Sequence, residues 1–333
     1  MPGLGDMLSY VVELAWAPFG TLFSLKADLN FVNLGGAILV ASIFYVLSPQ
    51  VRGKTTSFVE FLMPKSVYLH PSAILDYKYY FCFIVLRVFY VGALIGGMAV
   101  FAALMKDGLT ALFGAGHLIS APVWVAMLLA TVAEVVFFEL GYWTGHRLLH
   151  EVPALWEFHK VHHSAAVLTP TTGGRVHPVD DVVMGNCNAI VGGFGVGAVS
   201  WLFGETAQPF TIMGVNAWFV IYVATFFHMR HTNIWIAFTG PLGHVLQSPA
   251  HHQIHHSDAA IHAGTNLGYG MVFWDWAFGT LHVPTKQDQE TIVFGMGPEG
   301  AEYKTLYDGF ILPFWKAIRL AAPRPDASQV PAE

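Results

Sequence analysis

Histidine is concentrated in two similar segments of six residues, 159–164 and 252–257. They read His-Lys-Val-His-His-Ser and His-Gln-Ile-His-His-Ser, so each places imidazoles at positions i, i+3 and i+4. Residues three and four apart lie on one side of a helix, where they can bind one ion or two adjacent ions. Neutral imidazole is a common ligand for iron, zinc, copper and nickel. The repeated spacing therefore predicts a metal centre.

Further histidines extend this pattern. His146 and His150 form an H-x-x-x-H pair before the first repeat, and His228 and His231 lie between the two repeats. This many imidazoles exceeds what one tetrahedral ion requires, so the set suits two metals. The candidate metal ligands are His146, His150, His159, His162, His163, His228, His231, His252, His255 and His256.

A purely structural role, a haem site and a zinc-protease site fit these histidines less well. Ionisable groups packed together at membrane depth are costly without a partner, which disfavours a purely structural role. A transmembrane haem would need histidines paired across helix interiors. The zinc-protease signature H-E-x-x-H is absent, because His150-Glu151 is followed by Val-Pro-Ala. The isolated histidines His70, His117 and His282 are expected to be polar residues at a membrane surface.

The remaining sequence is typical of an integral membrane protein. Of 333 residues, 54% are hydrophobic and 11% are charged, whereas about a quarter are charged in soluble domains. The mean hydropathy is +0.51. The net charge of −6 is spread without acidic or basic runs, so no nucleic-acid partner is expected. Cys82 and Cys187 lie singly in apolar segments, which argues against thiolate ligands or a disulfide framework.

Apolar segments of about 20 residues can cross the hydrocarbon of a bilayer as helices. Segment 7–25 is apolar but interrupted, and is expected to be a helix lying in the interface. Basic residues cluster in the loops after the first and third predicted spans, which the positive-inside rule places in the cytoplasm. Every histidine cluster then lies on the cytoplasmic side. The predicted spans are 31–48, 80–105, 119–144, 179–203 and 210–227.

These histidine segments resemble those of a known family, the fatty acid hydroxylase and sterol desaturase superfamily of membrane di-iron oxidases. The resemblance covers roughly residues 130–285. The similar segments are 139–150 and 155–164 for the first two histidine boxes, 227–233 with His231 and Asn233 for a short H-x-N element, 249–257 for the last box, and 266–268 with 274–280 after it.

The resemblance implies an all-α integral membrane bundle of four to five transmembrane helices, whose cytoplasmic helical cap holds the dimetal site. Residues 1–125 would form the interfacial helix and the first transmembrane helices, and residues 126–285 the catalytic domain. Residues 286–333 would form a cytosolic extension with a disordered end. All the candidate ligands except His228 match the family's boxes, and His228, His177 or His262 would supply a tenth.

Carboxylates near the site are also predicted from the sequence. Asp275 is expected to be the catalytic-site carboxylate that orients a ligand imidazole through its other nitrogen. Asp180 and Asp181 begin a predicted span, where the helix dipole alone favours acidic residues, so they carry less weight.

The resemblance further implies two iron ions that activate dioxygen against a C–H bond of a membrane lipid, with zinc able to replace iron in purified protein. The chain has neither a cytochrome b5 haem motif nor a Gly-x-Gly-x-x-Gly nucleotide motif. A separate redox partner, such as a ferredoxin, a cytochrome b5-like protein or a reductase, is therefore expected. The sequence leaves the substrate and the oligomeric state open.

The expected reaction is hydroxylation, with desaturation as an alternative at the same ligand set. A zinc-dependent membrane hydrolase would need a general base, for which only Glu151 and Glu157 lie near the boxes. A metal-binding or transport protein would need polar residues running through its spans. The spans are mostly apolar, and their acidic residues Glu134 and Glu139 lie on one helix near the first box.

Overall fold

The computed structural model describes residues 20, 30–53, 57–204 and 207–321. Nearly all of the interfacial helix predicted at 7–25, and the predicted disordered end, lie outside these residues. In chain order, the helices up to α8 are α2 (Phe31–Leu47), α3 (Pro49–Arg52), α4 (Phe58–Leu62), α5 (Lys65–Tyr68), α6 (Pro71–Leu94), α7 (Met98–Phe113) and α8 (Val123–Glu151).

The later elements include one long helix, α10. They are α9 (Pro153–His163), η1 (Pro170–Gly174), α10 (Pro178–Phe203), β1 (Thr211–Ile212), β2 (Val215–Asn216), α11 (Ala217–Thr225), η2 (Phe227–His231), α12 (Gly240–Gly243), α13 (Pro249–His255), η3 (Ala260–His262), α14 (Phe273–Phe278), α15 (Lys286–Thr291), α16 (Gly297–Gly300), α17 (Leu306–Phe310) and α18 (Leu312–Ala321).

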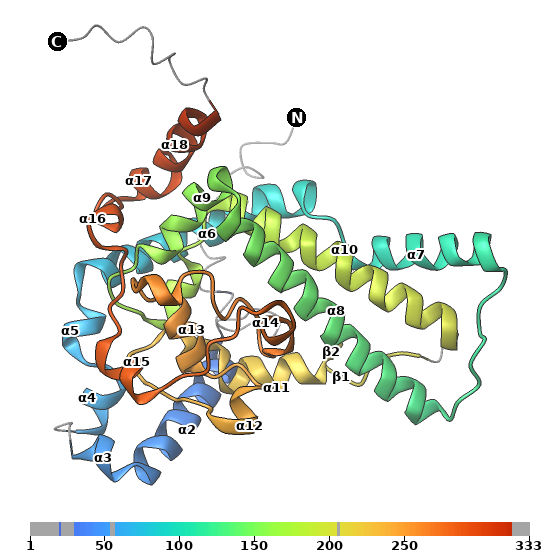
Figure 1. Ribbon diagram of the computed structural model, residues 1–333, viewed down its shortest axis with the longest axis horizontal. Helices are drawn as coiled ribbons and strands as arrows, with labels where there is room; N and C mark the ends of the chain where they lie inside the picture. The colour runs from blue at the N-terminus through green and yellow to red at the C-terminus, as the bar shows by residue number, and fades with distance from the viewer. Residues whose placement is uncertain (1–19, 21–29, 54–56, 205–206, 322–333) are drawn as a thin grey trace, which may run out of the picture.

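The described chain contains three helical segments that are long and apolar enough to cross a membrane. They are Pro71–Phe113, which comprises α6 and α7, then α8 and α10, and the shorter α2 is also apolar. Figure 1 shows α7, α8 and α10 side by side at one end of the molecule, with the short helices of the cap gathered at the other. The predicted membrane bundle is confirmed, with three long apolar helical segments in the described part.

Helix α8 joins the membrane bundle to the cap. Its 29 residues span roughly 43 Å as an α-helix, which exceeds the thickness of the hydrocarbon core. The predicted span 119–144 therefore continues as helix to Glu151. Because the helix is unbroken, His146 and His150 project from its last turns into the cap.

The segment predicted as a fifth span, 210–227, is not a transmembrane helix. It begins with the antiparallel hairpin β1–β2, and α11 has nine residues, roughly 14 Å of helix. Met213 and Gly214 take positive φ angles of 54° and 80°, which form the turn. The Asn216 amide donates to Glu134 Oε2 at 2.8 Å on α8. The apolar composition was sufficient for a span, but the turn interrupts the helix.

Helix α10 packs closely between α7 and α8, in agreement with the predicted span at 179–203. A Cβ atom at Gly193 would lie 2.6 Å from the Met98 carbonyl oxygen, and one at Gly197 would lie 2.3 Å from the Ala102 carbonyl oxygen. These glycines lower helix propensity in water, but they let the backbones of α7 and α10 approach. Close packing explains why this glycine-rich segment is a continuous helix.

The cap is tied to the membrane helices by a buried ion pair. Arg175, which follows η1, donates through Nη1 to Asp76 of α6 at 2.9 Å, and the Thr172 hydroxyl donates to the same carboxylate at 2.6 Å. Farther along the chain, Tyr79 of α6 packs with Val161 of α9 and Tyr303 in one apolar cluster. The C-terminal helices thus complete the wall of the cap around α9.

Candidate metal centre

Nine of the ten predicted ligands lie in two adjacent groups. Within each group, one potential ligand atom per residue lies within 4.8 Å of the others. All the members are buried or half-buried. The first group is His146, His150, His159, His163 and His255, and the second is His162, His231, His252 and His256.

The two repeats share their imidazoles between both groups. In α9, His159 and His163 at i and i+4 join the first group, while His162 joins the second. In α13 the assignment is reversed. His252 and His256, at i and i+4, join the second group, while His255 joins the first. Helices α9 and α13 therefore lie between the groups, and α8 and η2 complete one group each.

Three imidazoles of the first group are oriented by oxygen atoms at their Nδ1 positions. His146 Nδ1 lies 2.8 Å from the Leu267 carbonyl oxygen, His255 Nδ1 lies 2.8 Å from the Thr265 carbonyl oxygen, and His159 Nδ1 lies 3.1 Å from Asp180 Oδ2. A carbonyl oxygen only accepts, so Nδ1 of His146 and of His255 carries the proton, and Nε2 of each keeps its lone pair. This is the tautomer that a metal ligand requires.

Four of the five Nε2 atoms of this group make no hydrogen bond within the described structure. Those of His150, His159, His163 and His255 are buried and have no hydrogen-bond partner among the described residues. A buried polar atom without a partner is costly. Metal ions bound by the converging lone pairs would remove this cost.

In the second group, three Nε2 atoms form a triangle. The separations are 3.1 Å between His231 and His256, 3.0 Å between His252 and His231, and 3.1 Å between His256 and His252. A ring nitrogen either donates or accepts, so three such atoms cannot satisfy one another by hydrogen bonds. Nitrogen ligands at right angles on a metal, with bonds of about 2.1 Å, lie roughly 3.0 Å apart. The donor set fits a metal ion.

Burial keeps the cap imidazoles neutral. Burial is the largest cause of the shift that lowers the pKa of His162 to about 3, and the neighbouring His146 is the second cause. Neutral rings are the protonation state that binds metals. Burial, reinforced by neighbouring rings, also lowers the pKa well below the ordinary value for His159, His163, His231, His252, His255 and His256.

The expected contact between Asp275 and a ligand imidazole is not made. The carboxylate instead accepts from the backbone amides of Leu267 and Gly268 at 2.8 and 2.9 Å, and from Trp143 and Thr280. It therefore holds the loop whose Leu267 carbonyl accepts from His146. Burial raises the pKa of Asp275 to about 6.

Asp180 occupies the position that was predicted for Asp275. It begins α10, is 1% exposed, and contacts His159 directly. The dipole at a helix N-terminus explains an acidic residue there, but the contact with His159 depends on how α9 packs against α10. Glu139 is a second unpredicted carboxylate, which accepts from the backbone amides of Tyr269, Gly270 and Met271 at 2.8 to 3.0 Å.

The three candidates for a tenth ligand have different surroundings. His228 is buried in η2 but belongs to neither group. Both nitrogens of His177 are used, because Nδ1 accepts from the Val179 amide and Nε2 donates to the Phe310 carbonyl oxygen. His262 lies in a separate cluster with His282, and both rings contact Asp288 at 3.2 and 3.1 Å.

A cavity of about 400 Å³ opens onto the histidines. Its inner end is lined by imidazoles of both groups, including His146 and His231. Its walls are built by the membrane helices, with Phe83 from α6, Phe138 from α8 and Met184 from α10. The cavity therefore connects the membrane bundle with the candidate metal centre.

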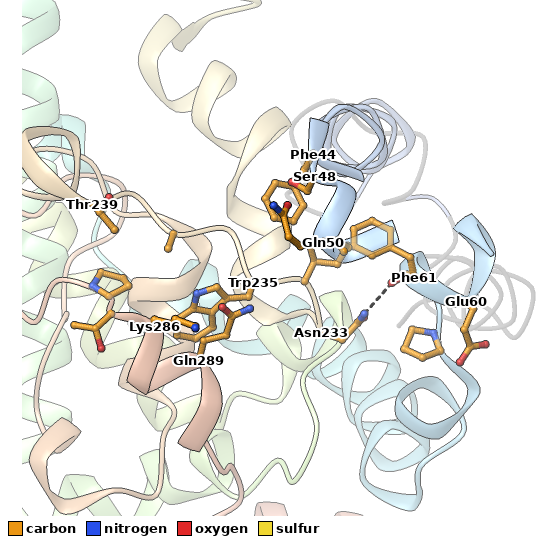
Figure 2. Close-up of a pocket in the computed structure, with 16 residues that line it drawn as sticks. Phe44, Ser48, Gln50, Glu60, Phe61, Asn233, Trp235, Thr239, Lys286 and Gln289 are labelled. Atoms are coloured by element: carbon orange, nitrogen blue, oxygen red, sulfur yellow. Dashed lines mark hydrogen bonds between the residues drawn. The ribbon is translucent and has the colours of Figure 1, made fainter. Parts of the chain in front are cut away.

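A larger cavity of about 1030 Å³ lies elsewhere, between α2–α4 and α15 (Figure 2). Gln50 and Lys286 are among the side chains that line it, and the Asn233 amide donates to the Phe61 carbonyl oxygen at 2.9 Å (Figure 2). No histidine of either group lines this cavity. The smaller cavity is the one with access to the imidazoles.

Comparison with known proteins agrees with the histidine pattern. Residues 131–280 match the model of the fatty acid hydroxylase family. These residues belong to the fatty acid hydroxylase family. The fatty acid hydroxylase domain contains both histidine groups and Asp275, and it begins within α8. The predicted family resemblance is confirmed.

Proteins similar to this fatty acid hydroxylase domain include lipid-modifying enzymes. The ornithine lipid hydroxylase OlsE of Rhizobium tropici is 30% identical over 167 residues, which cover 50% of this chain and 46% of the relative. The alkylglycerol monooxygenase of Homo sapiens is 26% identical over 158 residues, and that of Xenopus tropicalis 27% over 161 residues; each match covers 47% of this chain and 31% of the relative. No solved structure matches.

Proposed function

We propose that this protein is a membrane-bound non-haem di-iron oxygenase that uses dioxygen to hydroxylate a C–H bond of a lipid. The observation that carries the proposal is the pair of adjacent, buried histidine groups at the inner end of a cavity between membrane helices. The chain spans about a third to a half of the length of the curated relatives it matches. Their names, a lipid hydroxylase and a monooxygenase, support the same reaction class.

The two histidine groups would each hold one iron ion, which supplies the oxidising chemistry when dioxygen and electrons are provided. The chain contributes neutral nitrogen donors, and His146 and His255 are already held in the ligand tautomer by their Nδ1 contacts with carbonyl oxygens. Asp180 also places a carboxyl oxygen 3.1 Å from His159 Nδ1. Zinc can also occupy the site in purified protein, because imidazole sites bind it well.

The lipid would reach the histidines through the cavity of about 400 Å³. The α6, α8 and α10 side chains that wall this cavity come from the membrane-spanning helices. A lipid tail lying between these helices would place a carbon atom at the inner end. Exclusion of bulk water there would limit side reactions of the oxidant.

We further propose that the cap lies in the cytoplasm and receives electrons from a separate ferredoxin, cytochrome b5-like protein or reductase. The charge distribution of the loops supports this orientation. A desaturase remains the second candidate, since hydroxylation and desaturation would use the same ligand set.

A zinc-dependent hydrolase and a metal transporter are less well supported. The Glu157 carboxylate is not placed as a general base for the histidine groups, because it contacts Lys160 at 2.7 Å. Glu151 pairs with Arg147 on the exposed side of α8. A transport route would need polar side chains along the membrane helices, whereas Glu134 and Glu139 bind Asn216 and backbone amides.

Lipid mass spectrometry with labelled dioxygen tests the proposed function. Cells expressing the wild type and a His255→Ala/His256→Ala variant, which removes one imidazole from each group, would be compared. A lipid that gains one labelled oxygen only with the wild type is the expected result. Loss of two hydrogens without label would identify a desaturase.

The proposal would be contradicted if purified, iron-loaded protein oxidised no extracted lipid when supplied with a chemical reductant and dioxygen. Metal analysis of the same sample, with about two iron ions expected per chain from the two groups, would separate an unloaded site from a wrong assignment.

A further inference from the structure

The cavity that leads to the histidines contains a buried cation. Arg230 lines this cavity together with His231, its neighbour in η2. Arg230 is only 2% exposed. A buried charge is costly unless other groups compensate it. If the surrounding residues compensate Arg230 incompletely, a bound anion would stabilise it.

The direct contacts of the Arg230 guanidinium are with neutral groups, and they include hydrogen bonds with the Tyr142 and Tyr222 side chains. Its Cζ atom lies 4.3 Å from the ring centroid of Phe227 and 5.1 Å from that of Tyr269, and Nη1 donates to the Tyr269 carbonyl oxygen at 2.9 Å. In the described part of the chain, Nε is buried without a hydrogen-bond partner, and no carboxylate is hydrogen-bonded to this arginine. Aromatic rings compensate a cation only in part.

The carboxylates that line the same cavity contact residues other than Arg230. Asp180 contacts His159 through Oδ2, and Asp181 pairs with Arg87 at 2.8 Å. Glu139, a further nearby carboxylate, accepts from three backbone amides instead of from Arg230. The Arg230 cation therefore has no direct ion pair within the described chain, although Glu139 lies close enough to interact with it electrostatically.

We propose that Arg230 binds an anionic oxygen of the lipid substrate, so that the substrate class is a lipid with a carboxylate or phosphate group. This rests on the proposed function, because it assigns the lipid to the same cavity. The planar guanidinium suits both groups, since its N–H donors match two oxygen atoms of either. The anionic group would lie on Arg230, so that the carbon atoms next to it reach the neighbouring histidines, and the rest of the tail would run outward between α6, α8 and α10.

Binding of simple probes to the wild-type protein tests this directly. Palmitate, hexadecyl phosphate and hexadecanol carry the same tail, and their affinities for the metal-containing protein would be measured by native mass spectrometry from an uncharged detergent. At least one anionic probe should bind roughly tenfold to a hundredfold more tightly than hexadecanol. The preferred anion distinguishes carboxylate from phosphate. Equal affinities for all three would overturn the proposal.

An Arg230→Gln variant should lose this preference while its affinity for hexadecanol stays the same. Arg147→Gln is a matched control, because Arg147 also follows a candidate ligand, His146, and stacks on an aromatic ring, Trp143, at 5.0 Å. It lies outside the cavity, so its variant should keep the preference. Retention of the preference by Arg230→Gln, with metal content unchanged, would contradict the role of Arg230.

Arg230→Lys covers the case in which the glutamine variant does not fold. It keeps the charge but not the paired donors, so the preference should fall and not vanish; an unchanged preference would argue against bidentate binding by Arg230. All binding is measured without reductant or dioxygen. If the wild type oxidises lipid but does not prefer the anionic probes, the role of Arg230 is wrong and the proposed function stands. If it prefers the anionic probes but oxidises no lipid, the proposed oxygenase function is wrong.

Discussion

Each repeated histidine segment divides its three imidazoles between two groups, and this division depends on residue spacing. Positions i and i+4 of a helix lie nearly above one another, while i+3 is rotated to the side. His159 and His163 therefore face one group, and His162 faces the other. A helix that carries H-x-x-H-H can contribute to two neighbouring metal sites at once, which a pair at i and i+4 such as His146 and His150 does not do.

At the residue scale, Asp180→Asn should weaken metal binding. The carboxylate contacts His159 Nδ1 at 3.1 Å, and loss of such a partner lowers metal affinity roughly tenfold to a hundredfold. Metal retained after dialysis against a graded chelator series measures the effect. Asp181→Asn is the control, since the neighbouring Asp181 pairs with Arg87 and should leave metal affinity unchanged. Equal metal retention by both variants would contradict the role given to Asp180.

His177 should make stability depend on pH. Burial lowers the pKa of His177 to about 4, below its value in the unfolded chain. The unfolded state then binds the proton more readily, so stability is lost as pH falls below the unfolded pKa. Between pH 7 and pH 5 the loss amounts to about 2 kcal/mol.

The matched variant for this prediction is His177→Asn, whose side chain can still accept from the Val179 amide at the start of α10. Chemical unfolding in mild detergent at the two pH values should show that the wild type loses about 2 kcal/mol more than the variant. Equal losses would show that His177 does not bind the proton on unfolding.

At the element scale, continuity and close packing of helices position the site. Helix α8 carries two imidazoles from the membrane into the cap, and the loop after α13 is held against it by carboxylates on both sides. Asp275 binds the amides of Leu267 and Gly268, and Glu139 binds those of the next three residues. Backbone carbonyls of this loop region then orient His146 and His255. The oxygen atoms that fix these imidazoles thus come from a loop whose shape depends on distant acids.

Gly197→Ala should disrupt the contact between α7 and α10. The added Cβ would lie 2.3 Å from the Ala102 carbonyl oxygen, so the helices must move apart, at a cost typical of overpacking, about 1–3 kcal/mol. Gly108→Ala in α7 is the control, because nothing lies within 4 Å of its added Cβ. That variant should be neutral or stabilising, since alanine favours helix by about 1 kcal/mol. Thermal unfolding in detergent compares the two, and equal melting temperatures would contradict the proposed packing.

At the scale of the whole molecule, the metal centre lies at the end of the membrane bundle where α8 leaves it. The bundle supplies the walls of the cavity, and the cap supplies most of the imidazoles. The loop between α7 and α8 lies at the far end of α8 from the cap (Figure 1). The two ends of the molecule should therefore be accessible from opposite sides of a membrane.

Cysteine labelling tests this orientation. In a background with Cys82 and Cys187 replaced by serine, Glu290→Cys on the cap should react with a membrane-impermeant maleimide only after lysis. Leu118→Cys, at a residue that is 62% exposed between α7 and α8, should react in intact cells. The reverse pattern would place the histidines outside the cytoplasm.

The sequence was sufficient to predict the membrane class, the family and the nine histidines that the structure brings together, because these depend on composition and on local helical spacing. It did not predict that 210–227 forms a hairpin and a short helix, since a turn within an apolar run leaves the hydropathy unchanged. It also assigned Asp275 a contact that Asp180 makes. Which imidazoles share a group, which oxygens orient them, and that Arg230 lines their cavity depend on contacts between segments far apart in the chain, and such contacts are set by how the helices pack.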